Sequence, residues 1–316
     1  MSPDTCFICS KLLTKKDRSR EDVIPLWLQR KYELTNQRCR LLNKTYIPYR
    51  SLKVPCCNEC NNEHLARLES IVHESLIMGF EATSKLPEGY LYQWLAKIYV
   101  GLLYRELFLS LDRKKPEVGS ITTPDVFSNA RILWLWLQLS FSNKSAVRAP
   151  GSIFLFRCFV PPETNLQFDL LDNIDSECIA IRVGEVGIVA DLLDNHVHWD
   201  AGWSYFKKYQ SIPLHPLQFR EVATTIFYGA SLLDLETEIT AHAKEDGSMQ
   251  IEFRPVSKNE PRKLFREWNR TEYARMLAHY TELPLEKLSP TGDAVWTWLQ
   301  DASGNLVDVT KIKIPS

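Results

Sequence analysis

The apolar positions of this chain change their spacing along its length. Up to residue 60 they form only short stretches, separated by polar and turn-forming residues. After Cys60 they recur three or four residues apart, at Leu65, Leu68, Val72 and Leu76. This spacing predicts one apolar face of a helix. The asparagine pair directly after Cys60 is suited to cap the start of that helix.

Two longer apolar segments follow. Residues 90–111 are rich in Leu, Tyr, Trp and Ile and lie between turn-forming residues, which predicts a long, mostly buried helix. We also expect residues 130–139 to be helical, although their leucines and tryptophans would equally fill a buried strand. The longest apolar run, 98–104, is far shorter than the ~20 residues needed to cross a bilayer. Because the first residues also lack a signal-peptide pattern, we expect a cytoplasmic protein with no membrane partner.

After Pro150 and Gly151 the pattern changes to short β-branched and aromatic runs broken by turn residues. The predicted strands are 152–160, 167–171, 178–183, 187–192, 249–256, 295–299 and 306–312. The predicted helices of this part are 221–233 and 262–280. Strands and helices in separate blocks indicate the α+β class. We therefore expect a small first domain, 1–84, and a larger second domain, 85–316, that is helical at first and then antiparallel.

The composition is that of an ordinary globular protein, with 45% hydrophobic and 24% charged residues among 316. The net charge is −1, yet residues 1–70 carry 13 Lys and Arg against 8 Asp and Glu. The basic side chains expected to follow a nucleic-acid backbone are Lys15, Lys16, Arg18, Arg20 and Arg30. The alternative is that they form a solvated surface without a partner.

Four cysteines form two Cys-x-x-Cys pairs: Cys6 with Cys9, and Cys57 with Cys60. Thiolates at this spacing reach one tetrahedral ion from a tight turn, and two such turns complete its coordination. The sequence therefore predicts a structural Zn²⁺ site. Cys56 could compete as a ligand, although Cys57 and Cys60 have the right separation. The other cysteines are scattered, which suits a reducing compartment.

Segments 19–28 (SREDVIPLWL) and 57–62 (CNECNN), taken with the first cysteine pair, resemble the HNH endonuclease superfamily in its zinc-containing ββα-metal form. The resemblance covers about the first seventy residues. It implies a hairpin bearing a carboxylate-histidine pair, packed on a helix whose start supplies another ligand. A divalent cation between them would stabilise the leaving oxygen of a cleaved phosphodiester, while the histidine activates water.

Carried over by position, the resemblance makes Glu21 and Asn61 ligands of a catalytic Mg²⁺ or Mn²⁺. Asp22 stands where the general-base histidine is expected, and a carboxylate with a pKa near ~3.9 is a poor base at neutral pH. Asp22 is then an additional ligand, a weak base, or the mark of an inactive site. His64 follows Asn61 by three residues, so both project from one helix face. It could ligate the cation or transfer the proton, or it is a surface histidine.

Two functions remain open. The first is a metal-dependent HNH-like endonuclease that cleaves DNA or RNA, with the second domain selecting the target; family analogy places such enzymes in antiviral defence. The alternative is a catalytically degenerate zinc module that serves as a nucleic-acid-binding or protein-interaction scaffold. The chain has no P-loop, dinucleotide fingerprint or Gly-x-Ser-x-Gly motif.

Two weaker patterns lie in the second half. Asp194, His196, His198 and Asp200 could form a metal cluster in a loop, or they belong to an ordinary polar loop. In residues 205–209 (YFKKY) two lysines stand between aromatic residues, a mixture that suits nucleic acid.

Overall fold

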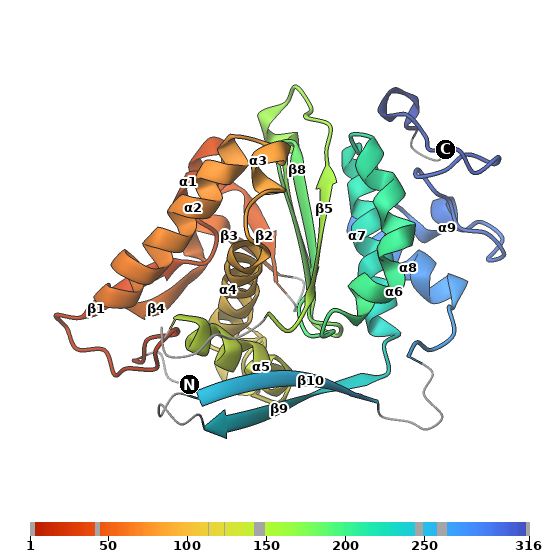
Figure 1. The fold of residues 1–316 in the computed structure, drawn as a ribbon. Coiled ribbons are helices and arrows are strands. Elements are labelled where there is room, and N and C mark those ends of the chain that lie inside the picture. Colours follow the sequence, from red (N-terminus) through yellow and green to blue (C-terminus); the bar gives the residue numbers. More distant parts are fainter. Residues whose placement is uncertain are drawn as a thin grey trace. The chain divides into compact units, whose positions relative to one another are not determined.

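The computed structural model describes residues 4–41, 45–112, 114–122, 124–141, 149–243, 249–257 and 264–313 (Figure 1). The chain divides into two compact units. The first comprises Met1–Ile77, Leu86–Ala149 and Ile239–Glu252, and the second comprises Met78–Lys85, Pro150–Glu238 and Phe253–Ser316. The division expected after residue 84 stays a prediction. Mixed helices and small antiparallel sheets confirm the α+β class.

In the first unit, strand β1 (Arg18–Asp22) pairs antiparallel with β4 (Lys53–Cys57). Arg18 lies opposite Cys57 and Asp22 lies opposite Lys53. The chain then passes through the π-helical segment η3 (Cys60–Leu65) into α2 (Ala66–Ile77), whose buried residues include the predicted apolar stripe. The unit thus has the order strand, strand, helix.

Small elements fill the connection between β1 and β4. These are α1 (Leu26–Lys31), η1 (Leu34–Asn36), β2 (Arg38–Arg40), β3 (Tyr46–Pro48) and η2 (Tyr49–Ser51). Both long apolar segments are helices, α4 (Glu88–Glu106) and α5 (Pro124–Phe141), with η4 (Pro116–Val118) between them. The strand alternative for 130–139 is therefore wrong. Helix α5 packs on α4, with the rings of Trp136 and Tyr92 edge to face at 4.7 Å.

The second unit contains a four-stranded antiparallel sheet in the order β5-β8-β7-β6. Its strands are β5 (Ser152–Arg157), β6 (Phe168–Asn173), β7 (Cys178–Val183) and β8 (Val186–Asp191), which confirms the strand predictions for this stretch. Every residue of β7 and β8 is buried. Gly184, at φ 58°, forms the tight turn between these two strands, a conformation that favours glycine.

Helices of the second unit pack on this sheet (Figure 1). Its helical elements are α3 (Phe80–Thr83), η5 (Thr164–Leu166), α6 (Val197–Phe206), η6 (Lys207–Ser211), α7 (Pro216–Ser231), α8 (Arg270–Thr281), α9 (Leu285–Leu288) and η7 (Val309–Lys311). Phe154 of the sheet shares one apolar core with Phe219 and Ile226 of α7. None of the helices in the described ranges is long and apolar enough to span a membrane.

Three predictions need correction. The helix predicted from residue 262 begins at Arg270, and residues 262 and 263 lie outside the described ranges. The strands predicted at 295–299 and 306–312 reduce to one antiparallel bridge between Gln300 and Leu306, next to a hydrogen bond from the N–H of Val307 to Leu299 O at 3.1 Å. Instead, the side chain of Gln218 on α7 donates to the carbonyls of Trp298 and Val307 at 2.9 and 2.8 Å. These backbone groups bond to a helix side chain rather than to a strand.

Helix α6 and strand β9 (Leu235–Ala243) are among the elements that the sequence missed. Helix α6 occupies the stretch that was expected to be a polar loop. Strand β9 pairs with β10 (Met249–Ser257), which was predicted.

Candidate functional site

The four paired cysteines gather in one place. The sulfur atoms of Cys6, Cys9, Cys57 and Cys60 lie within 4.8 Å of one another. Cys9 Sγ and Cys57 Sγ are 3.8 Å apart, which is close to the edge of a tetrahedron with metal–sulfur bonds of ~2.3 Å. The backbone N–H of Cys60 donates to Cys57 Sγ at 3.4 Å. The donor set and its spacing are compatible with a zinc site.

Local backbone structure positions the first pair. Ser10 has a φ of 59°, and its N–H donates to the carbonyl of Cys6 at 2.9 Å, which closes a tight turn. The N–H of Phe7 donates to Pro55 O of β4 at 2.9 Å, so this turn is attached to the strand that carries the second pair. Trp134 of α5 donates from Nε1 to Phe7 O at 2.7 Å. Strand β4 and helix α5 therefore both hold the cysteine turn.

The surroundings shift the thiol pKa values in different directions. Hydrogen bonds with Cys56 and Cys60 lower the pKa of Cys6. Burial raises the pKa of Cys9 to about 11. Hydrogen bonds with Cys56 and Cys6 raise the pKa of Cys60. A bound cation lowers thiol pKa values by compensating the thiolate charge. Cys56 remains a neighbour, with its Sγ 3.8 Å from Cys6 Sγ.

Glu21 of β1 belongs to a buried ion-pair network. Its carboxylate is 2.5 Å from Nζ of Lys97, a fully buried side chain of α4, which also lies 2.8 Å from Glu69 of α2. Lys97 Nζ also donates to the carbonyls of Asp22 and Val23 at 2.9 and 3.3 Å. Burial works to lower the pKa of Lys97, but attraction to the two carboxylates outweighs it and raises the pKa. Burial also raises the pKa of Glu21, with Lys97 acting against it.

The other residues of the expected catalytic set have separate partners. Asp22, next to Glu21 in a strand, projects to the opposite face and pairs with Lys53 at 2.9 Å. Asn61 Nδ2 donates to Ser19 Oγ at 2.6 Å. The ring of His64 lies 6.0 Å from the ring of Phe141.

The metal-binding atoms of Glu21, Asp22 and His64 do not gather in one place as the cysteine sulfur atoms do. Among the described residues, groups of three or more His, Cys, Asp and Glu side chains lie within 4.8 Å at the cysteine site and at Asp191, Asp194 and His198. Glu21, Asp22 and His64 form no such group. The cation in contact with Glu21 is the ammonium of Lys97.

A basic cavity of about 480 Å³ lies on the paired strands. It is lined by Arg18, Ser19, Arg20, Arg50, Ser51, Lys53, Val54, Pro55 and Arg105. No acidic residue of the described chain lines it. Burial, together with repulsion from Arg20, lowers the pKa of Arg105, whose buried Nε has no hydrogen-bond partner among the described residues.

The sequence identified this cavity in part. Arg18 and Arg20 were expected to contact nucleic acid, and they line it. The other three predicted residues, Lys15, Lys16 and Arg30, are not among its lining residues. Arg50 and Lys53 lie in the basic first seventy residues, so net charge could have indicated them. No signal in the sequence indicated Arg105, because it lies on helix α4, far from the other lining residues along the chain.

In the second unit, the residues that cluster in the structure differ from those that the sequence suggested as a metal site. Asp194 and His198 are buried with Asp191, while His196 and Asp200 lie outside the cluster. Asp194 caps the start of α6, accepting hydrogen bonds from Ser152 Oγ at 2.6 Å and from the backbone N–H of His198 at 2.7 Å. His198 Nδ1 lies 3.3 Å from Asp191 Oδ2. Hydrogen bonds within the fold account for these groups.

Comparison of the chain with protein-family models, with curated proteins and with solved structures found no match. Functional inference therefore rests on the cysteine cluster, the Lys97 network and the basic cavity.

Proposed function

We propose that the first unit is a zinc-stabilised nucleic-acid-binding module that holds a phosphate backbone in its basic cavity. The observation that carries this proposal is the set of five cationic side chains around one open cavity, with no acidic residue in its described lining. Two of the five also have a carboxylate partner outside the lining: Arg18 pairs with Asp4, and Lys53 pairs with Asp22. Neutralising phosphates and releasing their counterions supplies most non-specific nucleic-acid affinity.

The chemistry of the cavity suits phosphate in particular. Arg18, Arg20, Arg50 and Arg105 carry planar guanidinium groups, which bind phosphate oxygens in a bidentate manner. The hydroxyls of Ser19 and Ser51 add neutral donors. Arg105 brings a partly desolvated cation, because its Nε is buried and has no partner. A phosphate oxygen would relieve that cost.

Zinc has a structural role in this proposal. Bound by Cys6, Cys9, Cys57 and Cys60, it would join the first turn to the end of β4 and the start of the helical segment. Arg18 lies directly opposite Cys57 in the paired strands, so the ion would also hold the edge of the basic cavity in place. Four thiolates close the coordination sphere, which is the arrangement of structural rather than catalytic zinc.

Phosphodiester cleavage is the second candidate. The order of β1, β4 and α2 agrees with the ββα-metal form of the HNH superfamily, and Asn61 at the start of the helical segment contacts Ser19 of β1. The ion pair between Glu21 and Lys97 weighs against it, because a catalytic Mg²⁺ or Mn²⁺ would have to displace a buried ammonium. Binding without cleavage is therefore the stronger proposal. A role in defence would follow only from cleavage.

Binding is tested by fluorescence anisotropy with labelled duplex and single-stranded DNA and RNA over a range of salt concentrations. Arg18→Ala with Arg20→Ala should weaken binding and reduce the slope of log affinity against log salt, by ~0.9 per lost contact to duplex DNA. Arg30→Ala is the matched control, since Arg30 is an exposed arginine outside the cavity. Equal losses in both variants, or no loss in the first, would refute the proposed surface.

Cleavage is tested on plasmid and RNA with Mg²⁺ and with Mn²⁺. Binding without cleavage, both in the native chain and in Asp22→His, supports the scaffold. Cleavage that disappears in Glu21→Ala would instead establish the enzyme.

A further inference from the structure

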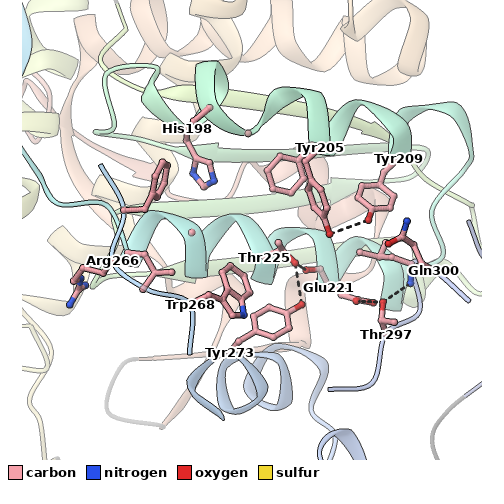
Figure 2. A pocket seen from close by; sticks show the side chains of 17 residues that line it. His198, Tyr205, Tyr209, Glu221, Thr225, Arg266, Trp268, Tyr273, Thr297 and Gln300 are labelled. Carbon is pink, nitrogen blue, oxygen red and sulfur yellow. Dashed lines mark hydrogen bonds between the residues drawn. The ribbon is translucent and has the colours of Figure 1, made fainter. Parts of the chain in front are cut away.

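The second unit contains an aromatic cavity of about 620 Å³ among α6, α7 and the segment that leads into α8 (Figure 2). The polarisable rings on its walls are those of Tyr205, Phe206, Tyr209, Phe265, Trp268 and Tyr273. The volume lies within the ~300–1,000 Å³ typical of sites for small organic ligands.

The floor of the cavity is one face of α7. Glu221, Thr225 and Gly229 follow one another at intervals of four, so they share that face. A Cβ at Gly229 would lie 2.9 Å from Nε2 of His198. Glycine at this position therefore leaves room for the imidazole at one end of the cavity, while Glu221 lies toward the other end (Figure 2).

Two exposed aromatic side chains face the cavity from opposite walls. Tyr205 comes from α6 and Trp268 from the segment before α8 (Figure 2), and each is 47% exposed. Their neighbours fix their orientation. The ring of Trp268 contacts that of Tyr273 at 5.0 Å, and Tyr205 contacts Tyr209 both by its ring at 5.7 Å and by its hydroxyl at 3.3 Å. The walls thus offer held ring faces to a flat ligand.

Polar groups are concentrated on the α7 side. The carboxylate of Glu221 is buried and accepts hydrogen bonds from Thr297 Oγ1 at 2.5 Å and from the N–H of Trp298 at 2.7 Å. No Lys or Arg of the described residues forms an ion pair with it. Thr225 Oγ1 and the hydroxyl of Tyr273 lie 3.1 Å apart. Acceptors and hydroxyl donors therefore lie beside the aromatic walls.

We propose that this cavity binds a nucleobase, stacked on Tyr205 and Trp268 with its polar edge toward Glu221 and Thr225. Aromatic walls recognise bases by stacking, and a carboxylate accepts from the exocyclic amino group of a base. The site lies in the second unit and does not rest on the basic cavity of the first.

The surrounding charges favour a nucleobase over an organic cation, the other ligand that tyrosine and tryptophan rings attract. Arg266 belongs to the lining of the cavity. Lys208 Nζ already lies 4.3 and 4.9 Å from the ring centroids of Tyr205 and Tyr209. These positive charges oppose a cationic ligand, whereas they suit the phosphate attached to a nucleoside.

The test is calorimetric titration of the full chain with the monophosphates AMP, GMP, CMP, UMP and dTMP, and with ribose 5-phosphate. We expect at least one nucleotide to bind and ribose 5-phosphate not to bind. Trp268→Ala and Tyr205→Ala should each weaken binding by about 5- to 150-fold, the usual range for loss of base stacking. Trp296→Ala, which removes a tryptophan that is 43% exposed and outside the cavity, should leave it unchanged. Glu221→Gln should change the preference among bases.

Four outcomes would overturn the nucleobase site. The first is that no monophosphate binds with a dissociation constant below about 1 mM. The second is equal binding of ribose 5-phosphate. The third is that tetramethylammonium binds in place of every nucleotide. The fourth is that Trp296→Ala weakens nucleotide binding as much as Trp268→Ala does.

A second titration shows whether the bound base belongs to a nucleic-acid strand or to a free nucleotide. The chain carrying Arg18→Ala and Arg20→Ala keeps the aromatic cavity intact while weakening the basic cavity, so loss of backbone binding and loss of base binding are read separately. In this chain, a short single-stranded oligonucleotide that binds tighter than its monophosphate, and loses affinity with Trp268→Ala, indicates a nucleic-acid strand. Equal or tighter binding of the monophosphate indicates a free nucleotide.

Discussion

The two units differ in how they accommodate buried carboxylates. In the first, fully buried Lys97 lies between two carboxylates. In the second, Asp191, Asp194 and Glu221 are buried, and none of them forms an ion pair with a Lys or Arg in the described residues. Burial raises their pKa values to about 8, 7 and 7. The first unit thus depends on opposite charges brought together. The second contains such a pair too, Arg182 with Asp169 at 2.6 Å, and adds acids whose raised pKa values favour the protonated form.

The two units also differ in which elements carry the apolar core, since most residues of helix α4 are buried in the first. The second unit has a sheet whose central strands are buried throughout and covered by α7, so hydrophobic burial carries its stability. The paired strands β1 and β4 of the first unit are each five residues long. Small sheets bury little apolar surface and usually need a metal or another cross-link.

Loss of the metal should have the largest effect on stability, and it should separate the first unit from the second most clearly. We expect about one zinc ion per chain, and we expect a chelator or Cys57→Ser to unfold the strands around the cysteine site. Structural zinc contributes ~10–16 kcal/mol in small zinc-finger peptides. Hydrogen exchange should show lost protection in β1 and β4 and retained protection in β7 and β8.

Cys39→Ser is the matched control for zinc loss, because Cys39 lies outside the cluster. Retained protection of β4 in Cys57→Ser, with zinc still bound, would show that another thiol, Cys56 first, completes the site.

Lys97→Met should give the next largest effect, because it leaves Glu21 and Glu69 without their cation. Removing one partner of a buried ion pair costs ~3–5 kcal/mol. Lys53→Met removes the partly exposed partner of Asp22 and should cost only ~0–1 kcal/mol. Urea denaturation measures both variants.

Adding Glu21→Gln and Glu69→Gln to Lys97→Met should recover most of the lost stability. A chain with Lys97→Met that is as stable as the native chain would mean that the two carboxylates are already neutral.

The spacing of residues along the chain predicted those helices, strands and sites that depend on neighbouring residues alone. The stripe after Cys60, the two long helices and the sheet strands of 152–191 follow from apolar periodicity, and the cysteine cluster follows from thiol spacing. The run 295–299 has the β-branched and aromatic composition of a strand. Its backbone instead bonds to Gln218 and Glu221 of α7, which no local pattern records.

The candidate site was predictable to the same extent. Arg18 and Arg20 alternate on β1, so their common face could be inferred from the sequence. The pairing of Glu21 with Lys97 could not, because it joins a short strand to a helix 76 positions later. A single lysine in an apolar helix suggests an aliphatic stem with its head in water, whereas this one is fully buried.

Asp191→Asn should give the smallest effect, and it tests the second half of the comparison. Burial raises the pKa of Asp191 from 3.8 to about 8, so the folded chain holds a proton that the unfolded chain has lost. Stability from this group is complete below the unfolded pKa and is lost as pH rises toward 8. Between pH 6.5 and 8 the loss is about 2 kcal/mol, at ~1.4 kcal/mol per pH unit.

His198 acts in the opposite direction, because burial lowers its pKa to about 4 and its contribution to stability rises with pH until the unfolded imidazole, with a pKa of ~6.5, has lost its proton. Calorimetric melting should show a smaller fall in Tm from pH 6.5 to 8 for Asp191→Asn than for the native chain. Asp200→Asn, an exposed change in the same segment, should follow the native chain. Parallel falls in all three chains would mean that Asp191 is already ionised when folded. The second unit would then hold a buried negative charge, and the contrast with the Lys97 network would be lost.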